Sequence, residues 1–409
     1  MIGTTIEFFD FYIYATAAAL VFPKLFFPQY DPATGVLQSF ATFALAFFAR
    51  PVGSALFGHF GDRIGRKATL VTALLTMGAS TVLIGILPTY DSIGVGAAVL
   101  LAICRLGQGI GLGGEWGGAI LLATENAPPG KESWYGSFPQ LGAPLGFLCA
   151  TGVFLGLTRG LTDAEFLSWG WRVPFLASAV LVGVGLFIRL QLVETLQFSR
   201  LLAQGERVRI PIVTVFSRHG ATLLLGTLAA TATFVVFYLM TVFSLSWATS
   251  KLGFTRERFL ELLMIGVLFF GATIPISALA ADRIGARGML IVASVALFAL
   301  GFTFAPLLGA GTTAGVLAFL VIGLAATGLT YGPLGSGLAT LFPTAIRYTG
   351  TSLAFNFAGI LGASVAPYVA TKLALGFGLA YVGYYLSGAA TLSLLALLAV
   401  RAPPENPLG

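Results

Sequence analysis

Twelve long apolar runs fill most of this chain, and they limit its fold more than any other feature. An α-helix needs about 20 apolar residues to cross a bilayer, and these runs do not alternate as membrane β-strands must. We therefore predict an all-α membrane protein with twelve transmembrane helices. The runs fall at about 5–27, 37–57, 69–88, 93–122, 134–157, 172–193, 219–248, 259–281, 288–308, 313–336, 348–372 and 377–400.

The composition excludes a soluble protein. Charged residues make up 9% of the chain and apolar residues 57%, whereas a soluble domain carries about 25% charged residues. The net charge of +6 comes from Lys and Arg in short loops, which indicates orientation in a membrane and not nucleic-acid binding. The two cysteines, Cys104 and Cys149, both lie in apolar runs, so we predict no disulfide framework, metal site or cofactor.

A polar and basic stretch after the sixth run divides the chain. We predict one bundle of six helices over residues 1–193, a cytoplasmic linker over 194–218 and a second bundle of six over 219–409. Basic residues are more numerous in the loops on the side of the linker. This asymmetry predicts that both termini are cytoplasmic.

The loops after the second and eighth runs repeat one pattern. Gly58-His-Phe-Gly-Asp-Arg-Ile-Gly-Arg-Lys67 corresponds to Ala278-Leu-Ala-Ala-Asp-Arg-Ile-Gly-Ala-Arg287. A parallel repeat of six helices is typical of transporters that work by alternating access. The plain interpretation is a pair of basic loops that orient the chain, and beside it we predict a latch between the halves, since the acids can accept bonds from helix N-termini. The residues of this latch are Gly58, Asp62, Arg63, Arg66, Lys67, Asp282, Arg283 and Arg287.

Two carboxylates lie in the first run, at Glu7 and Asp10. Their spacing of three places both on one face of a helix. A charge at membrane depth costs about 2.5–3.5 kcal/mol and is kept where it faces a cavity or a partner. Burial and a neighbouring carboxylate both favour the protonated form of an acid, so we predict that this pair couples protons. The alternative for Glu7 is a side chain that reaches the cytoplasmic edge.

The fourth run carries Arg105 at its centre, Gln108 one turn further on and Glu115 toward the cytoplasm. A guanidinium stays charged, so it requires an anionic partner or substrate. Asp10 is the expected partner, and its protonation would free Arg105 to bind a substrate carboxylate. The alternative is a static ion pair that sets helix packing. Glu115 fits a second proton relay or a gate equally well.

Other intramembrane polar and aromatic residues are candidates for the substrate site. Arg50 is a second cation within a run, and it can bind an anion or balance Glu7 or Glu115. Aromatic side chains in so Phe-rich a chain also serve packing. The remaining candidates for substrate contact are Tyr12, Gln140, Tyr238, Tyr331 and Asn356.

The stretch Gly109-x-Gly111-x-x-Gly114 matches a dinucleotide-binding fingerprint, but the context is wrong for one. No strand precedes it, and it lies inside a predicted membrane helix. Small residues in such helices allow close contact between neighbours. We therefore predict that these glycines, with Gly142 and Gly146, pack helices together.

Five stretches resemble a known family. The stretch 58–67 is similar to the signature between helices 2 and 3 of the major facilitator superfamily, and Arg105-Leu-Gly-Gln-Gly to its helix 4 signature. Three others resemble the metabolite:proton symporter branch, and they are Glu7-Phe-Phe-Asp-Phe-Tyr12, Gly170-Trp-Arg-Val-Pro-Phe175 and Phe342-Pro-Thr-Ala-Ile-Arg-Tyr-Thr-Gly350.

The resemblance implies the major facilitator fold and a place in a bacterial inner membrane. It also implies symport of an organic acid, such as shikimate, α-ketoglutarate or citrate, or of a zwitterion such as betaine. The chain departs from the branch at Phe8 and Phe9, where Trp and Tyr are usual. It also has Ala286 in place of a basic residue, which weakens the second loop signature.

The leading functional prediction is proton-coupled import of a small shikimate-like acid or di- or tricarboxylate by a monomer in the lipid bilayer. Its partners are the substrate and protons. A proton-coupled exporter of drugs or metabolites and a zwitterionic osmolyte symporter are the alternatives. An enzyme is not expected, since the sequence has no catalytic constellation and no phosphate-binding loop.

Overall fold

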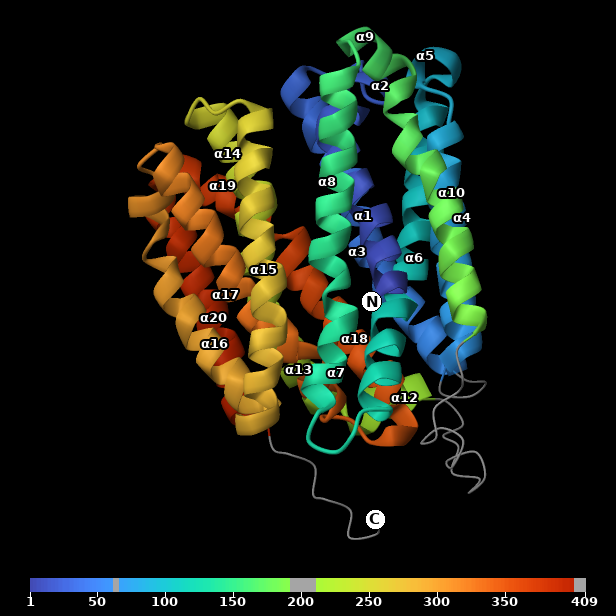
Figure 1. Ribbon diagram of the computed structural model, residues 1–409. Coiled ribbons are helices and arrows are strands. Elements are labelled where there is room, and N and C mark those ends of the chain that lie inside the picture. The colour runs from blue at the N-terminus through green and yellow to red at the C-terminus, as the bar shows by residue number, and fades with distance from the viewer. Residues whose placement is uncertain (62–65, 192–210, 401–409) are drawn as a thin grey trace. The chain divides into compact units, whose positions relative to one another are not determined.

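The computed structural model of the protein describes residues 1–61, 66–191 and 211–400. These residues form helices joined by short turns, with no strand among them (Figure 1). The main helices are α1 (Ile2–Leu20), α3 (Pro32–Gly61), α4 (Arg66–Ile86), α6 (Val95–Glu125), α7 (Glu132–Gln140), α8 (Gly142–Gly160), α10 (Arg172–Leu190), α13 (Gly220–Tyr238), α14 (Ser244–Lys251), α15 (Arg256–Ile284), α16 (Ala286–Gly301), α17 (Thr313–Ala339), α18 (Arg347–Gly359), α19 (Ala366–Phe377) and α20 (Leu379–Ala399).

The helices have the length and composition of membrane spans. Within the described part of the chain, ten are long and apolar enough to cross a bilayer, and α16 is a shorter apolar helix. The first predicted run forms α1, of 19 residues. Two spans contain π-helical segments, at Leu239–Phe243 between α13 and α14 and at Ile360–Ser364 between α18 and α19. The prediction of an all-α membrane fold is confirmed.

The chain divides into two compact units. The first holds Met1–Ala119 and Leu141–Glu194, and the second holds Ile120–Gln140 and Thr195–Gly409. The end of α6 and all of α7 therefore pack with the second unit, where α7 lies against α15 and α17. In the first unit α1 packs against α8 and α10, and α4 packs against α10.

Glycines bring α6 against α3 in the first unit. A Cβ atom on Gly113 would lie 2.1 Å from the carbonyl oxygen of Arg50, and one on Gly53 would lie 2.0 Å from that of Ile110. The Ser54 hydroxyl donates hydrogen bonds to the carbonyls of Arg50 and Gly113, at 3.0 and 2.8 Å. A Cβ atom on Gly109 would lie 2.5 Å from the Ala46 carbonyl oxygen, and one on Gly114 would lie 2.3 Å from Phe57 Cβ, so the predicted packing role of these two glycines is confirmed.

We expect Gly113→Ala to destabilise the protein, because the added methyl group would overlap the α3 backbone. Overpacking of this kind costs about 1–3 kcal/mol. Gly152→Ala on α8 is the matched control, since a Cβ atom there meets nothing within 4 Å. Thermal unfolding in detergent would show a lower Tm for Gly113→Ala only. Equal Tm values for the two variants would contradict the packing account.

The two units repeat the same neighbour pattern. In the second unit α13 packs against α18 and α16 against α20, as α1 packs against α8 and α4 against α10 in the first. Equivalent cations of the two loop signatures make equivalent contacts. Lys67 Nζ donates to the Leu190 carbonyl at the end of α10. Arg287 donates to the carbonyls of Leu397 and Leu398 at the end of α20. Each cation thus caps the C-terminus of the last helix of its unit, where positive charge is favoured.

Candidate functional site

Asp10 is completely buried near the middle of α1. The Ser178 hydroxyl on α10 donates a 2.8 Å hydrogen bond to Asp10 Oδ2. The Thr81 side chain on α4 lies near the same carboxyl group, and its hydroxyl donates to the Met77 carbonyl at 3.0 Å. A buried carboxyl with neutral hydroxyl neighbours can exist in both protonation states, since a hydroxyl can donate or accept a hydrogen bond.

Two hydrogen bonds lead from Arg105 to Thr81, whose side chain lies beside Asp10. Gln108 Nε2 donates to Thr81 Oγ1 at 2.8 Å, and Arg105 Nη1 donates to Gln108 Oε1 at 3.0 Å. No direct ion pair joins Asp10 and Arg105 in the part of the chain that the structure describes. The expected contact between them is therefore indirect, because Thr81 and Gln108 lie between the two charges.

Arg105 is completely buried among aromatic rings. Its Cζ atom lies 4.0 Å from the ring centroid of Tyr14 and 4.7 Å from those of Phe11 and Phe43. Its Nε also donates to the Phe43 carbonyl at 3.4 Å. Aromatic faces attract a cation and hold a planar guanidinium in a fixed orientation.

Arg50 is the second buried cation, and it shares an aromatic ring with Arg105. Its Cζ atom lies 4.5 Å from the centroids of Phe11 and Phe47. The Phe11 ring is thus in contact with both guanidinium groups. Two positive charges gathered in a low-dielectric region repel each other, so an anion bound near them would be stabilised.

A charged triad lies beside this site. Arg189 near the end of α10 forms ion pairs with Glu7 on α1 and with Glu115 on α6. It also donates a hydrogen bond to the Leu70 carbonyl on α4. Arg189 was not among the site residues predicted from the sequence, where Arg50 was considered as the counterion of Glu7 or Glu115. The sequence signal for a buried cation was its position, because Arg189 lies within the sixth apolar run.

The remaining candidate residues are buried in both units. Tyr12 packs its ring against Phe147, with centroids 4.9 Å apart. In the second unit, Gln140 Nε2 donates to the Tyr331 carbonyl at 2.8 Å, which joins α7 to α17. Asn356 donates to the Ser352 carbonyl at 2.8 Å within α18. Tyr238 packs against Phe237, and its role stays a prediction.

The latch residues have different environments. Asp282 caps α7, since its carboxylate accepts hydrogen bonds from the backbone N–H groups of Ser133 at 2.8 Å and Trp134 at 3.0 Å. Gly58 lies inside α3, which continues to Gly61, so Gly58 does not form the predicted turn. In the second unit, Gly285 follows α15 with φ +82°. The side chain of Arg283 is exposed. Asp62, Arg63 and the side chain of Arg66 lie outside the described residues.

We expect Asp282→Ala to loosen the N-terminus of α7, because two backbone donors would lose a charged acceptor. Loss of a helix cap costs about 0.5–2 kcal/mol. Hydrogen exchange followed by mass spectrometry would detect faster exchange in peptides that cover Glu132–Gln140. Asp91→Ala removes an exposed carboxylate from another helix and serves as the control. Unchanged protection in Asp282→Ala would refute the capping role.

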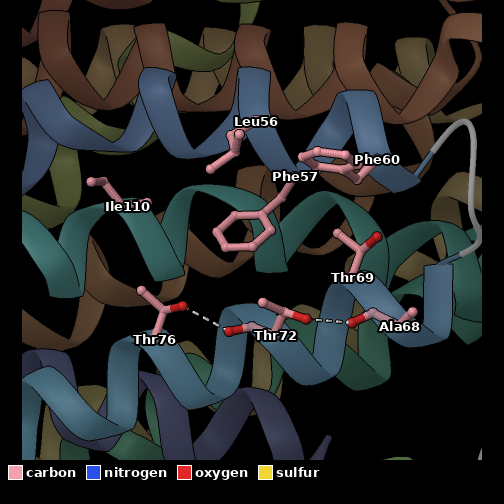
Figure 2. Close-up of a pocket in the computed structure, with 8 residues that line it drawn as sticks. All are labelled: Leu56, Phe57, Phe60, Ala68, Thr69, Thr72, Thr76 and Ile110. Atoms are coloured by element: carbon pink, nitrogen blue, oxygen red, sulfur yellow. Dashed lines mark hydrogen bonds between the residues drawn. The ribbon is translucent and has the colours of Figure 1, made fainter.

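An apolar cavity of about 400 Å³ lies between α3, α4 and α6 (Figure 2). Among the described residues, its lining includes Leu56, Phe57, Phe60 and Ile110 and no charged side chain. As Figure 2 shows, two of its hydroxyl groups are engaged within α4, since Thr72 and Thr76 donate to backbone carbonyls one turn earlier. The part of the lining that the structure describes therefore offers no cation to bind an organic anion.

Sequence comparisons give a consistent result. The family model described as sugar (and other) transporter matches residues 1–208. The chain is 56% identical over 404 residues to the inner membrane metabolite transport protein YhjE of Escherichia coli strain K12, with 97% of this chain and 92% of that protein covered. It is 37% identical over 377 residues to the shikimate transporter of the same strain, with 91% and 85% covered.

The fold has solved counterparts. The proton:xylose symporter XylE bound to 6-bromo-6-deoxy-D-glucose, of the major facilitator superfamily, superposes with a TM-score of 0.78. The alignment covers 97% of this chain and 92% of that chain, at 17% sequence identity. At this identity the comparison shows the shared fold alone.

Proposed function

Because this chain belongs to the sugar (and other) transporter family, within the major facilitator superfamily, we propose that it imports a small organic acid together with protons. The observation that carries the proposal is the buried placement of the Asp10 carboxyl beside Thr81, which is joined through Gln108 to the Arg105 guanidinium by two hydrogen bonds. An acid that can be neutral or charged is thereby linked to a permanent cation.

The substrate class follows from the charge of the site. Arg105 and Arg50 both contact the Phe11 ring, and a guanidinium binds a carboxylate through two parallel hydrogen bonds. Gln108 and Tyr12 are the proposed neutral contacts in this unit, and Gln140, Tyr238, Tyr331 and Asn356 those of the second unit. The similarity to a shikimate transporter supports a cyclic or branched monocarboxylate as the first compound to test.

Proton coupling follows from competition for Arg105. When Asp10 is charged, its field acts on Arg105 through the connecting amide and hydroxyl. When Asp10 is protonated, more of the positive potential of Arg105 is available to an anion. Binding of the proton and of the anion therefore favour each other, which makes this a symport mechanism.

The proposal includes the membrane in which the protein lies and its orientation there. The similarity to an inner membrane transporter and the basic loops support a bacterial inner membrane with both termini in the cytoplasm. The protein is proposed to act as a monomer, with the predicted halves 1–193 and 219–409 moving about the linker 194–218. The proposed latch consists of Gly58, Asp62, Arg63, Arg66, Lys67, Asp282, Arg283 and Arg287.

Uptake by purified protein in proteoliposomes tests the proposed function. With radiolabelled shikimate outside and an acidic external buffer, we expect accumulation that collapses when a protonophore removes the pH gradient. The same vesicles tested for efflux separate import from proton-coupled export. Substrate movement that needs no proton gradient in either direction would contradict the proposal.

A further inference from the structure

The charged triad of Glu7, Arg189 and Glu115 is not used by the proposed anion site. Oε1 of each glutamate contacts the same nitrogen, Nη2 of Arg189, so the two carboxylates are close neighbours. The side chains of Glu7 and Glu115 are 2% and 0% exposed, and that of Arg189 is 6% exposed. Three helices, α1, α6 and α10, thus bring three ionisable groups into one buried cluster.

The side-chain charges of the triad itself do not balance. Two ionised carboxylates beside one guanidinium leave one negative charge, and burial opposes a net charge. Two carboxylates that share a site can hold one proton between them and titrate as a pair. One added proton would leave the triad neutral and keep an ion pair to Arg189.

The other charged groups around the triad are identified. On α1, the α-amino group of Met1 interacts with Glu7 and Arg189, and Asp10 interacts with Glu7. On α3, Arg50 lies over Phe11 and Phe47. On α4, Lys67 donates to the Leu190 carbonyl. The α-amino group adds positive charge, but it gives no carboxyl signal and can be distinguished by spectroscopy.

The position of Glu7 on α1 supports proton transfer between the triad and Asp10. Glu7 precedes Asp10 by three residues, so the two lie one turn apart on the same face of α1. A proton that leaves the Asp10 carboxyl therefore has an acceptor nearby, and Asp10 becomes a carboxylate as the glutamate pair becomes singly protonated. The hydrogen bond from Arg189 to the Leu70 carbonyl ties the triad to α4 and holds its geometry.

We propose that Glu7 and Glu115 bind one proton between them and form a second proton site beside Asp10, with Arg189 as the positioning residue. This site deepens the proposed proton coupling and rests on it for its role in transport. Proton binding itself is measured without substrate or gradient, so failure of the two proposals can be told apart.

Infrared difference spectroscopy of the purified protein in lipid nanodiscs, titrated with pH, tests the second site. We expect two titrating signals from protonated carboxyl groups. Asp10→Asn should remove one of them, and Glu7→Gln and Glu115→Gln should each remove the other, because a single glutamate paired with Arg189 stays ionised. One signal only, or two signals that both survive either glutamate substitution, would overturn the proposal.

Two further variants separate a positioning role from a purely structural one. Arg189→Lys keeps the charge, so the shared-proton signal should persist, whereas Arg189→Gln should retain that signal to higher pH because a positive charge is lost. Glu165→Gln is the control, since hydrogen bonds from Thr162 lower the pKa of this exposed carboxylate. A signal unchanged in both Arg189 variants would contradict the assigned role of Arg189. Thermal unfolding identifies any variant that does not fold, and if Arg189→Gln does not fold, loss of the shared-proton signal in folded Arg189→Lys would contradict the role.

Discussion

Asp10→Asn is expected to abolish uptake driven by a pH gradient while sparing exchange of substrate across the membrane. The amide keeps the shape of the carboxyl and a hydrogen-bond acceptor for Ser178, but it cannot bind or release a proton. The variant therefore resembles the protonated transporter, in which Arg105 is available to the anion. Proteoliposomes assayed for gradient-driven uptake and for counterflow would separate the two activities.

A control for the loss of one carboxyl group is Asp163→Asn, which changes an exposed residue at the start of the short helix Asp163–Glu165. This variant should keep both activities at the level of the unmodified protein. Asp10→Asn transport that retains its full dependence on the pH gradient would show that the coupling proton binds elsewhere.

Arg105→Ala is expected to weaken binding of the organic acid strongly. The substitution removes a charge-assisted pair of hydrogen bonds, and a loss of about 1.5–3 kcal/mol corresponds to ~10-fold to ~100-fold in Kd. Arg105→Lys should recover only part of this loss, because an ammonium group does not make the bidentate contact of a guanidinium. Isothermal titration calorimetry of the purified variants measures the change directly.

Arg258→Ala provides the matched comparison for Arg105→Ala. The Arg258 side chain is 54% exposed and pairs with Glu261 on the surface of α15. Its removal should leave the Kd unchanged, since an exposed ion pair contributes little. Equal affinity of Arg105→Ala and the unmodified protein would exclude Arg105 as the anion receptor.

Local patterns in the sequence were sufficient to predict the spanning helices and the glycine contacts that pack them together. Long apolar runs predict spanning helices because a bilayer offers no alternative partners to the backbone. The packing role of Gly109 and Gly114 was also predictable, because glycines inside a membrane helix allow close contact between neighbouring helices. By contrast, the position at which α3 ends is three residues beyond Gly58, since helix boundaries depend on local contacts.

Side-chain partners were harder to predict, because they depend on how helices distant in the sequence pack. Arg189 was not predicted as a site residue, yet α10 brings it to Glu7 and Glu115. Ser178 and Thr81 gave no signal of their own, since single hydroxyl groups are common in membrane helices. The direct pairing of Asp10 with Arg105 followed from charge alone, and it omitted the amide and hydroxyl that lie between them.

Proton uptake on substrate binding tests coupling between Asp10 and Arg105 most directly. Purified protein in weakly buffered detergent solution is mixed with the carboxylate that gives the largest thermal shift, and a pH indicator records the change. We predict that anion binding draws protons from solution, and that Asp10→Asn binds the anion without this uptake. Saturating binding with no proton uptake by the unmodified protein between mildly acidic and neutral pH would contradict the mechanism.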